Sequence, residues 1–184
     1  MPSGLNIPNL LTLLRIILVP VVVILLMQEL FLDALIVCVI AGITDGLDGF
    51  LARKLNQMTP LGAYLDPLAD KALLTTSFVT LAILGAIPGW LAVVVLSRDF
   101  IILFGVSIMF LMSIPFVVAP SFVSKITTCC QFALVCVVLV YLSFAGANEW
   151  RVLSFLCWLT AAATIVSGLH YIYKGVCYIN SAEK

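Results

Sequence analysis

Apolar stretches long enough to cross a membrane recur along the whole sequence, and they constrain the fold more than any other feature. An α-helix needs about 20 apolar residues to span the hydrocarbon layer, and it satisfies its own backbone hydrogen bonds there. Such stretches occupy residues 8–27, 31–53, 61–84, 90–112, 121–144 and 151–173. The sequence therefore predicts an all-α, polytopic membrane protein with six transmembrane helices.

The composition agrees with a membrane protein. Of the 184 residues, 64% are hydrophobic and 10% are charged, which is too little polar surface for a soluble domain of this size. The short connections between the expected helices favour a single membrane domain over residues 1–184. The nine basic and nine acidic residues cancel, so no general attraction for nucleic acid is expected.

The basic residues indicate how the helices are oriented. Arg53, Lys54, Lys125 and Lys174 fall at alternate ends of the expected helices, and basic residues are enriched in cytoplasmic connections. Both chain ends are then expected on the cytoplasmic side, together with the connection that follows Arg53. Arg151 lies on the opposite side, which weakens this orientation without reversing it.

Five of the nine acidic residues lie inside or at the ends of the apolar stretches: Asp45, Asp48, Asp66, Asp70 and Asp99. Burying an ionised carboxylate in a membrane costs several kcal/mol or more, so such residues need partners. Asp45 and Asp48 share one helical face with Gly49 and Ala52, within about 100°. Gly62, Asp66 and Asp70 share a face of the next helix, within about 80°. Each of these two helices therefore has one candidate reactive face.

The segment between these two helices favours a tight hairpin. Residues 55–60 contain turn-forming and helix-starting types, so the two aspartate faces can meet. At 1.5 Å per residue, Asp48 lies about 12 Å from Asn56, which is near the depth of lipid headgroups. Small residues on the same faces would let a bulky ligand approach the backbone, although small residues are also common where membrane helices pack.

Four carboxylates in a small volume repel one another, and only Arg53 and Lys71 lie close in sequence to compensate. Hard oxygen ligands suit Mg²⁺ or Mn²⁺, and four carboxylates are enough to hold two ions. Two such ions would bridge the phosphates of a substrate and favour displacement at phosphorus. Buried salt bridges do not explain the cluster, because four acids face two bases. A cation-coupled transporter remains a non-enzyme alternative, but it would need polar residues running toward the far side of the membrane.

The spacing of these residues resembles the signature of the CDP-alcohol phosphotransferase family. Eight identities carry the resemblance: Asp45, Asp48, Gly49, Ala52, Arg53, Gly62, Asp66 and Asp70. The likeness extends through Asn6 to Asn9, Thr12, Arg15 and the segment Ser97-Arg98-Asp99. It implies a six-helix fold that is usually a homodimer, with CDP-diacylglycerol as the lipid substrate.

The resemblance also implies roles for individual residues. Asp45, Asp48 and Asp66 would bind metal, and Asp70 would act both as a metal ligand and as the general base. The CDP pocket would be formed by Asp48, Gly49, Ala52, Arg53 and Gly62. A carboxylate such as Asp70 suits this work, because an alcohol is a poor nucleophile until its proton is removed.

The acceptor alcohol is suggested by two cationic residues, Arg98 and Lys125, near the expected cytoplasmic ends of their helices. They would bind an anionic acceptor, unless they are only membrane anchors or snorkelling residues. Arg15 has the same two interpretations. The first three helices resemble phosphatidylglycerophosphate synthases, whose acceptor is glycerol 3-phosphate. Val106 and Thr127 stand where those synthases often carry a second arginine and a second lysine. The segments around Arg98 and Lys125 instead resemble CMP-forming cardiolipin synthases, whose acceptor is phosphatidylglycerol.

Glycerol 3-phosphate is ranked first, because a compact chain of this kind is more commonly the glycerophosphate enzyme. The expected location is the inner membrane of a bacterium, with the active site facing the cytoplasm. Surrounding membrane lipids are then its environment as well as the source of its substrate.

Overall fold

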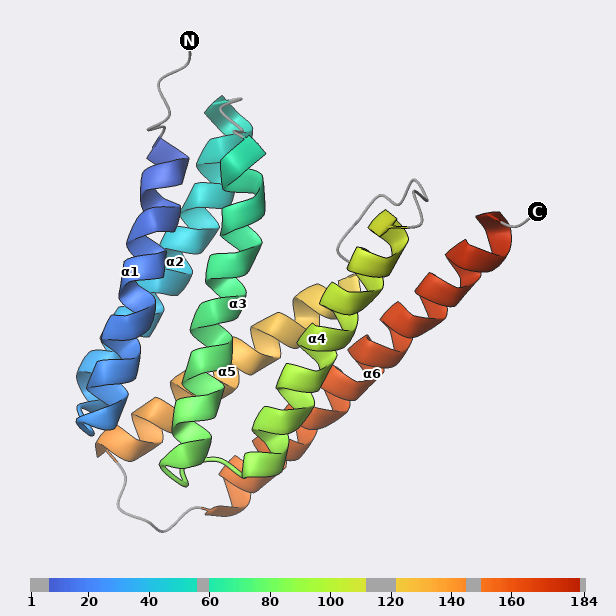
Figure 1. The fold of residues 1–184 in the computed structure, drawn as a ribbon. Coiled ribbons are helices and arrows are strands. Elements are labelled where there is room, and N and C mark those ends of the chain that lie inside the picture. Colours follow the sequence, from blue (N-terminus) through green and yellow to red (C-terminus); the bar gives the residue numbers. More distant parts are fainter. Residues whose placement is uncertain (1–6, 56–59, 112–121, 145–149, 183–184) are drawn as a thin grey trace. The chain divides into compact units, whose positions relative to one another are not determined.

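The computed structural model describes the backbone of residues 7–55, 60–111, 122–144 and 150–182. Within these segments, it describes the side chains of residues 13–44, 71–105, 107, 123–144 and 151–177. The helices are α1 (Ile7–Met27), α2 (Phe31–Leu55), α3 (Pro60–Ile83), α4 (Gly89–Leu111), α5 (Phe122–Phe144) and α6 (Trp150–Ala182) (Figure 1). No strand occurs in these ranges, which confirms the expected all-α class. Apart from the end of α6, the helices begin and end within about two residues of the expected limits.

Helix α6 is longer than the sequence analysis predicts. It continues to Ala182 and contains 33 residues, whereas the expected helix ended at residue 173. The expected end was wrong because it followed hydropathy, which falls at Lys174, and lysine is a good helix former. At 1.5 Å per residue, α6 is about 50 Å long, which exceeds the roughly 30 Å hydrocarbon layer of a bilayer.

Short turns with left-handed residues separate two pairs of consecutive helices. Glu29, between α1 and α2, has a φ of 59°, and Gly85, between α3 and α4, has a φ of 71°. At the first turn, the Leu30 amide donates to the Leu25 carbonyl at 3.0 Å, which satisfies a carbonyl left open at the end of α1. The short link between α1 and α2 makes these two helices antiparallel neighbours, and they pack against each other.

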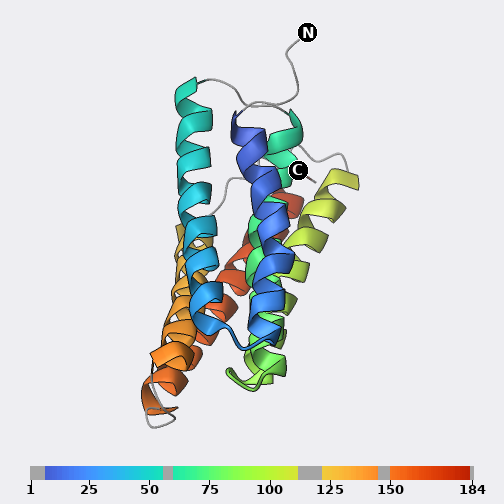
Figure 2. The same cartoon turned by 90° about the vertical axis from the view of Figure 1, so that its left-hand side faces the viewer.

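The described chain divides into two compact units, and the expected single domain over residues 1–184 stays a prediction. The first unit comprises Met1–Ala86 and Val135–Asn148. Within it, α1 packs against both α2 and α3, as the two views show (Figures 1 and 2). Its core contains fully buried apolar side chains from three helices, including Val22, Leu26 and Phe78. Helix α1 therefore holds together the two helices that carry the aspartates.

The second unit comprises Ile87–Leu134 and Glu149–Lys184. Here α4 packs against α6, and Leu91 and Val95 of α4 are fully buried. The rings of Trp90 and Trp158 join the same two helices, with centroids 4.8 Å apart and planes inclined by 37°. The first half of α5 completes the unit through hydrogen bonds to α6.

Membrane-spanning character is clearest in the last two helices. By length and composition, the described residues contain two helices able to cross a membrane, Val123–Phe144 and Arg151–Cys177. Shorter apolar helical segments cover Leu13–Met27, Phe31–Thr44 and Lys71–Ile83. Large apolar side chains face outward on several helices, as Ile83, Phe104 and Phe144 do with 79%, 70% and 74% of their surface exposed. Six membrane crossings remain a prediction.

Candidate active site

The second half of α2 and the first half of α3 carry the eight residues of the signature. Both segments are helical, so the predicted grouping on two helical faces agrees with the backbone. Asp45 lies ten residues before the end of α2 at Leu55, and Asp70 lies ten residues after the start of α3 at Pro60. Each distance along its helix is about 15 Å, which places these two positions at matching depths on the two arms.

The side chains of the signature residues lie outside the described ranges. This applies to Asp45, Asp48, Gly49, Ala52, Arg53, Gly62, Asp66 and Asp70, and also to the connection at residues 56–59. Their roles as metal ligands, base and CDP contacts therefore stay predictions. Among the side chains that are described, no three His, Cys, Asp or Glu residues come together as they would around a metal ion.

Contacts in the described part of the first unit fix α2 and α3 relative to each other. Cys38 of α2 and Ser77 of α3 are each 1% exposed, and a side-chain hydrogen bond joins them. Just before the first aspartate, the Thr44 hydroxyl donates to the carbonyls of Ile40 and Ala41 at 2.9 Å. That hydroxyl is thus satisfied within its own helix. Beyond the aspartate segments, the two arms are therefore joined by the buried hydrogen bond between Cys38 and Ser77 and by α1, which packs against both.

Arg15 is a buried cation in the unit that carries the aspartates. It is 1% exposed, whereas the neighbouring residues Leu14 and Ile16 are 42% and 38% exposed. A membrane anchor would extend its charged group to the surface, so this burial excludes the snorkelling interpretation for Arg15. A buried guanidinium needs negative partners, and α1 packs against both helices that carry acidic residues. The sequence singled out Arg15 but left its role ambiguous.

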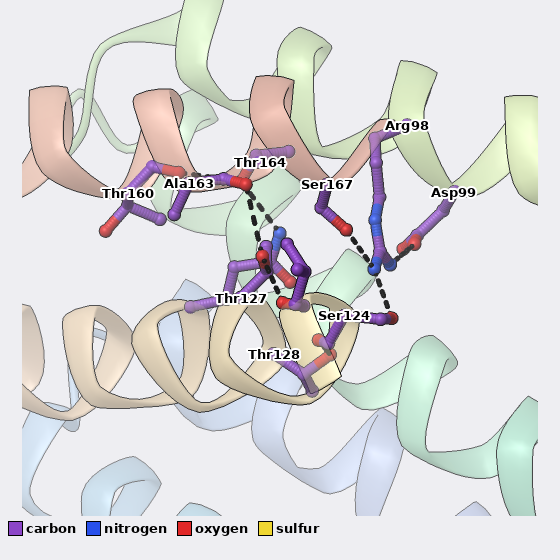
Figure 3. A network of polar contacts seen from close by, with 11 residues as sticks. Arg98, Asp99, Ser124, Thr127, Thr128, Thr160, Ala163, Thr164 and Ser167 are labelled. Carbon is purple, nitrogen blue, oxygen red and sulfur yellow. Dashed lines mark hydrogen bonds and ion pairs between the residues drawn. The ribbon is translucent and has the colours of Figure 1, made fainter. Parts of the chain in front are cut away.

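Arg98 is the centre of a polar cluster in the second unit, formed with Asp99, Ser124 and Ser167 (Figure 3). Its Nη1 donates to Asp99 Oδ1 at 2.7 Å, which is also an ion pair. Its Nη2 donates to Ser124 Oγ at 2.5 Å and to Ser167 Oγ at 3.0 Å. The Arg98 cluster thus connects α4, α5 and α6, and the arginine itself is only 5% exposed.

The other predicted acceptor residue, Lys125, directly follows Ser124 and is exposed. The structure therefore brings Arg98 to the residue beside Lys125. Thr127, two residues beyond Lys125, is 1% exposed. Its hydroxyl lies 2.9 Å from the Val123 carbonyl and 3.1 Å from the Ala163 carbonyl, so it serves helix packing. The side chain of Val106 lies outside the described ranges.

A row of polar side chains between α5 and α6, the α5–α6 polar row, was not predicted from the sequence. Its buried members are Thr127 and Gln131 on α5 and Thr160, Thr164 and Ser167 on α6, and the half-buried Ser124 extends it toward the start of α5. All of them except Gln131 are labelled in Figure 3. The Gln131 amide donates to the Thr164 hydroxyl at 3.2 Å, and that hydroxyl donates to the Thr160 carbonyl at 2.7 Å. Helical spacing was the available signal, since polar residues recur at i, i+3 and i+7 on α5.

Comparison with known proteins decides what the signature means. Residues 5–166 match the family model of CDP-alcohol phosphatidyltransferase, and this range includes every signature residue. The chain belongs to the CDP-alcohol phosphatidyltransferase family. The resemblance predicted from the sequence is confirmed. Membership of an enzyme family favours the enzyme hypothesis over the transporter hypothesis, which the carboxylates alone had left open.

Similar proteins with two different named activities match most of this phosphatidyltransferase. It is 32% identical over 184 residues to a CDP-diacylglycerol–glycerol-3-phosphate 3-phosphatidyltransferase of Bacillus subtilis (strain 168), covering 92% of this chain and 94% of that protein. A second protein of that name, from Aquifex aeolicus, is 39% identical over 128 residues, covering 67% of this chain and 69% of the relative. A CMP-forming cardiolipin synthase of Rattus norvegicus is 36% identical over 189 residues, covering 93% of this chain and 63% of that protein.

Proposed function

We propose that this phosphatidyltransferase makes phosphatidylglycerophosphate from CDP-diacylglycerol and glycerol 3-phosphate, releasing CMP. The observation that carries the proposal is the complete signature, from Asp45 to Asp70, on two consecutive helices within the matched region. Similarity to the Bacillus enzyme over nearly the full length of both chains supports the choice of acceptor.

The reaction transfers a phosphatidyl group from one oxygen to another. The acceptor hydroxyl oxygen attacks the phosphorus that bears diacylglycerol, and the bond from that phosphorus to the CMP oxygen breaks. CMP leaves with the bonding electron pair, and the hydroxyl proton passes to the Asp70 carboxylate as the new bond forms. Gly49, Ala52, Arg53 and Gly62, with Asp48, would hold the CDP group.

The donor set suits divalent metal, because four carboxylates supply hard oxygen ligands and excess negative charge. Asp45, Asp48, Asp66 and Asp70 would hold two Mg²⁺ or Mn²⁺ ions. When bound, such ions neutralise phosphate charge and support departure of CMP. We place these residues at the cytoplasmic face of a bacterial inner membrane, in a homodimer whose subunits each cross the membrane six times.

Cardiolipin synthesis from phosphatidylglycerol is the second candidate, and the surroundings of Arg98 favour it. Three hydrogen bonds already engage the Arg98 guanidinium, and Thr127 is a buried neutral group. By the resemblance, glycerophosphate synthases often carry a second lysine at this position. Lys125 alone then supplies a single positive charge. That charge matches the singly charged phosphodiester of phosphatidylglycerol better than the phosphate monoester of glycerol 3-phosphate. The chain spans 63% of the length of the cardiolipin synthase it matches.

The deciding experiment offers purified protein CDP-diacylglycerol and Mg²⁺ with glycerol 3-phosphate or phosphatidylglycerol, and identifies the lipid product by mass spectrometry. Phosphatidylglycerophosphate is the expected product, and chelation with EDTA should abolish CMP release. Asp33→Asn is a matched control for Asp45→Asn, since Asp33 lies exposed in the first turn of the same helix. Cardiolipin as the sole product would reverse the choice of acceptor, and undiminished activity of Asp45→Asn would refute the metal site.

A further inference from the structure

The Arg98 guanidinium has little capacity left for a substrate phosphate. Of its five N–H donors, three are committed, one to Asp99 and two to the serines Ser124 and Ser167. Arginine grips a phosphate best through two adjacent N–H groups that point the same way. Both such edges of the guanidinium include Nη2, whose two hydrogens are used by the serines. A bidentate grip by Arg98 would therefore require breaking at least one serine contact.

Helix α6 is shaped to receive this arginine. Gly168 lies against the Arg98 stem, and a Cβ placed on Gly168 would meet Arg98 Cγ at 3.7 Å. The preceding residue, Ser167, is fully buried and directs its hydroxyl to Nη2 (Figure 3). Both α6 residues lie beyond residue 166, where the family match ends. Their role is therefore read from the contacts in this structure.

The hydrogen bond from Arg98 to Ser124 fixes the position of the first turn of α5, which carries Lys125. Ser124 is the third residue of α5, which begins at Phe122, and the first amides of a helix lack partners within it. Such a turn depends on outside contacts for a fixed position. Arg98 supplies one at Ser124, and the Thr127 hydroxyl supplies another through the Ala163 carbonyl. Lys125 lies between these two contacts and is itself exposed.

We propose that Arg98 is a positioning residue anchored by Ser167, and that Lys125 alone of the two cations contacts the anionic acceptor. Arg98 acts by fixing the first turn of α5, so that the Lys125 ammonium is presented in one place. The inference rests on the proposed function, because it assigns work within the acceptor site of that enzyme.

A double-mutant cycle tests the proposal with whichever acceptor yields product. Ser167→Ala should raise the KM for acceptor roughly three- to tenfold, the range expected from loss of one buried hydrogen bond, and leave the KM for CDP-diacylglycerol unchanged. In a Lys125→Ala background, the same change should have no further effect on that KM, since the residue it positions is gone. Ser167→Thr keeps the hydroxyl and should restore the acceptor KM. Ser107→Ala is the control, because its hydroxyl donates to the Leu103 carbonyl of its own helix at 2.8 Å.

Several outcomes would overturn the proposal. Equal effects of Ser167→Ala with and without Lys125 would mean that Arg98 contacts the acceptor directly. Equal increases in both KM values would indicate a general loss of structure. If Ser167→Ala does not fold, Ser124→Ala breaks the other serine contact and must give the same dependence on Lys125. Wild-type protein that releases no CMP with either acceptor refutes the proposed function, and the inference with it, whereas active protein with additive variants refutes the inference alone.

Discussion

Gly168 offers a quantitative test of how Arg98 is packed against α6. A methyl group at this position would lie 3.7 Å from Arg98 Cγ and 4.0 Å from Arg98 Cβ, which is ordinary van der Waals contact. Gly168→Ala should therefore fit without displacing the arginine. Because glycine in a helix costs about 0.5–1 kcal/mol relative to alanine, this variant should be more stable by up to that amount.

A larger side chain at Gly168 should have the opposite effect. Gly168→Leu adds three carbons beyond the position that is already in contact, so the Arg98 stem must move. Overpacking of this kind costs about 1–3 kcal/mol, and loss of each charged hydrogen bond to Ser124 or Ser167 adds about 1.5–3 kcal/mol. The expected destabilisation is thus at least about 2 kcal/mol, together with a higher KM for acceptor.

The stability assay is reversible unfolding in mixed micelles of increasing SDS content, followed by near-ultraviolet circular dichroism. Gly105 provides the matched control, because it lies in α4 with no atom within 4 Å of an added Cβ. Gly105→Ala and Gly105→Leu should both be tolerated. The packing argument would be refuted if Gly168→Ala lost more than about 1 kcal/mol, or if leucine were accepted equally well at Gly168 and Gly105.

Three further predictions concern the first unit and the chemistry. In CMP-release assays, Asp70→Asn should lower kcat by roughly 10²–10⁴, and excess Mg²⁺ or Mn²⁺ should not restore it. Excess metal should partly restore the activity of Asp45→Asn. Recovery of Asp70→Asn by metal would contradict its role as base. Phe78→Ala, at a side chain with no exposed surface, should lose about 3–5 kcal/mol of unfolding free energy, while Phe104→Ala, 70% exposed, should change it little. Arg15→Met removes a buried positive charge beside the acidic helices, so its thermal midpoint should fall further in metal-free buffer than with Mg²⁺; equal losses in both buffers would argue against electrostatic coupling.

The helices could be predicted from the sequence because membrane-length apolar runs leave few alternatives. The end of α6 could not, since hydropathy reports where a chain leaves the hydrocarbon and Lys174 does not stop a helix. The aspartate grouping follows from helical spacing within α2 and α3, and their helical backbones agree with it. Placing the carboxylate oxygens requires side-chain positions that spacing alone does not give.

Contacts between distant segments were the hardest to predict. Arg98 and Ser167 are 69 residues apart, and nothing local to either residue indicates that they are hydrogen-bonded. The burial of Arg15 likewise depends on how α1 packs against two other helices. The α5–α6 polar row did leave a periodic signal, but single serines and threonines are common in membrane helices, where they bond to their own backbone. Only the packing of α5 against α6 in the structure shows which of these hydroxyls form hydrogen bonds between the two helices.

The contact between Trp90 and Trp158 gives this enzyme an internal spectroscopic probe. The protein has three tryptophans, and these two indoles lie 4.8 Å apart at a tilt of 37°. Indole rings this close and inclined couple electronically, so their near-ultraviolet dichroism depends on the distance and angle between them. One ring belongs to α4, which carries Arg98, and the other to α6, which carries Ser167. Any movement of these helices against each other during acceptor binding would change that signal without an added label.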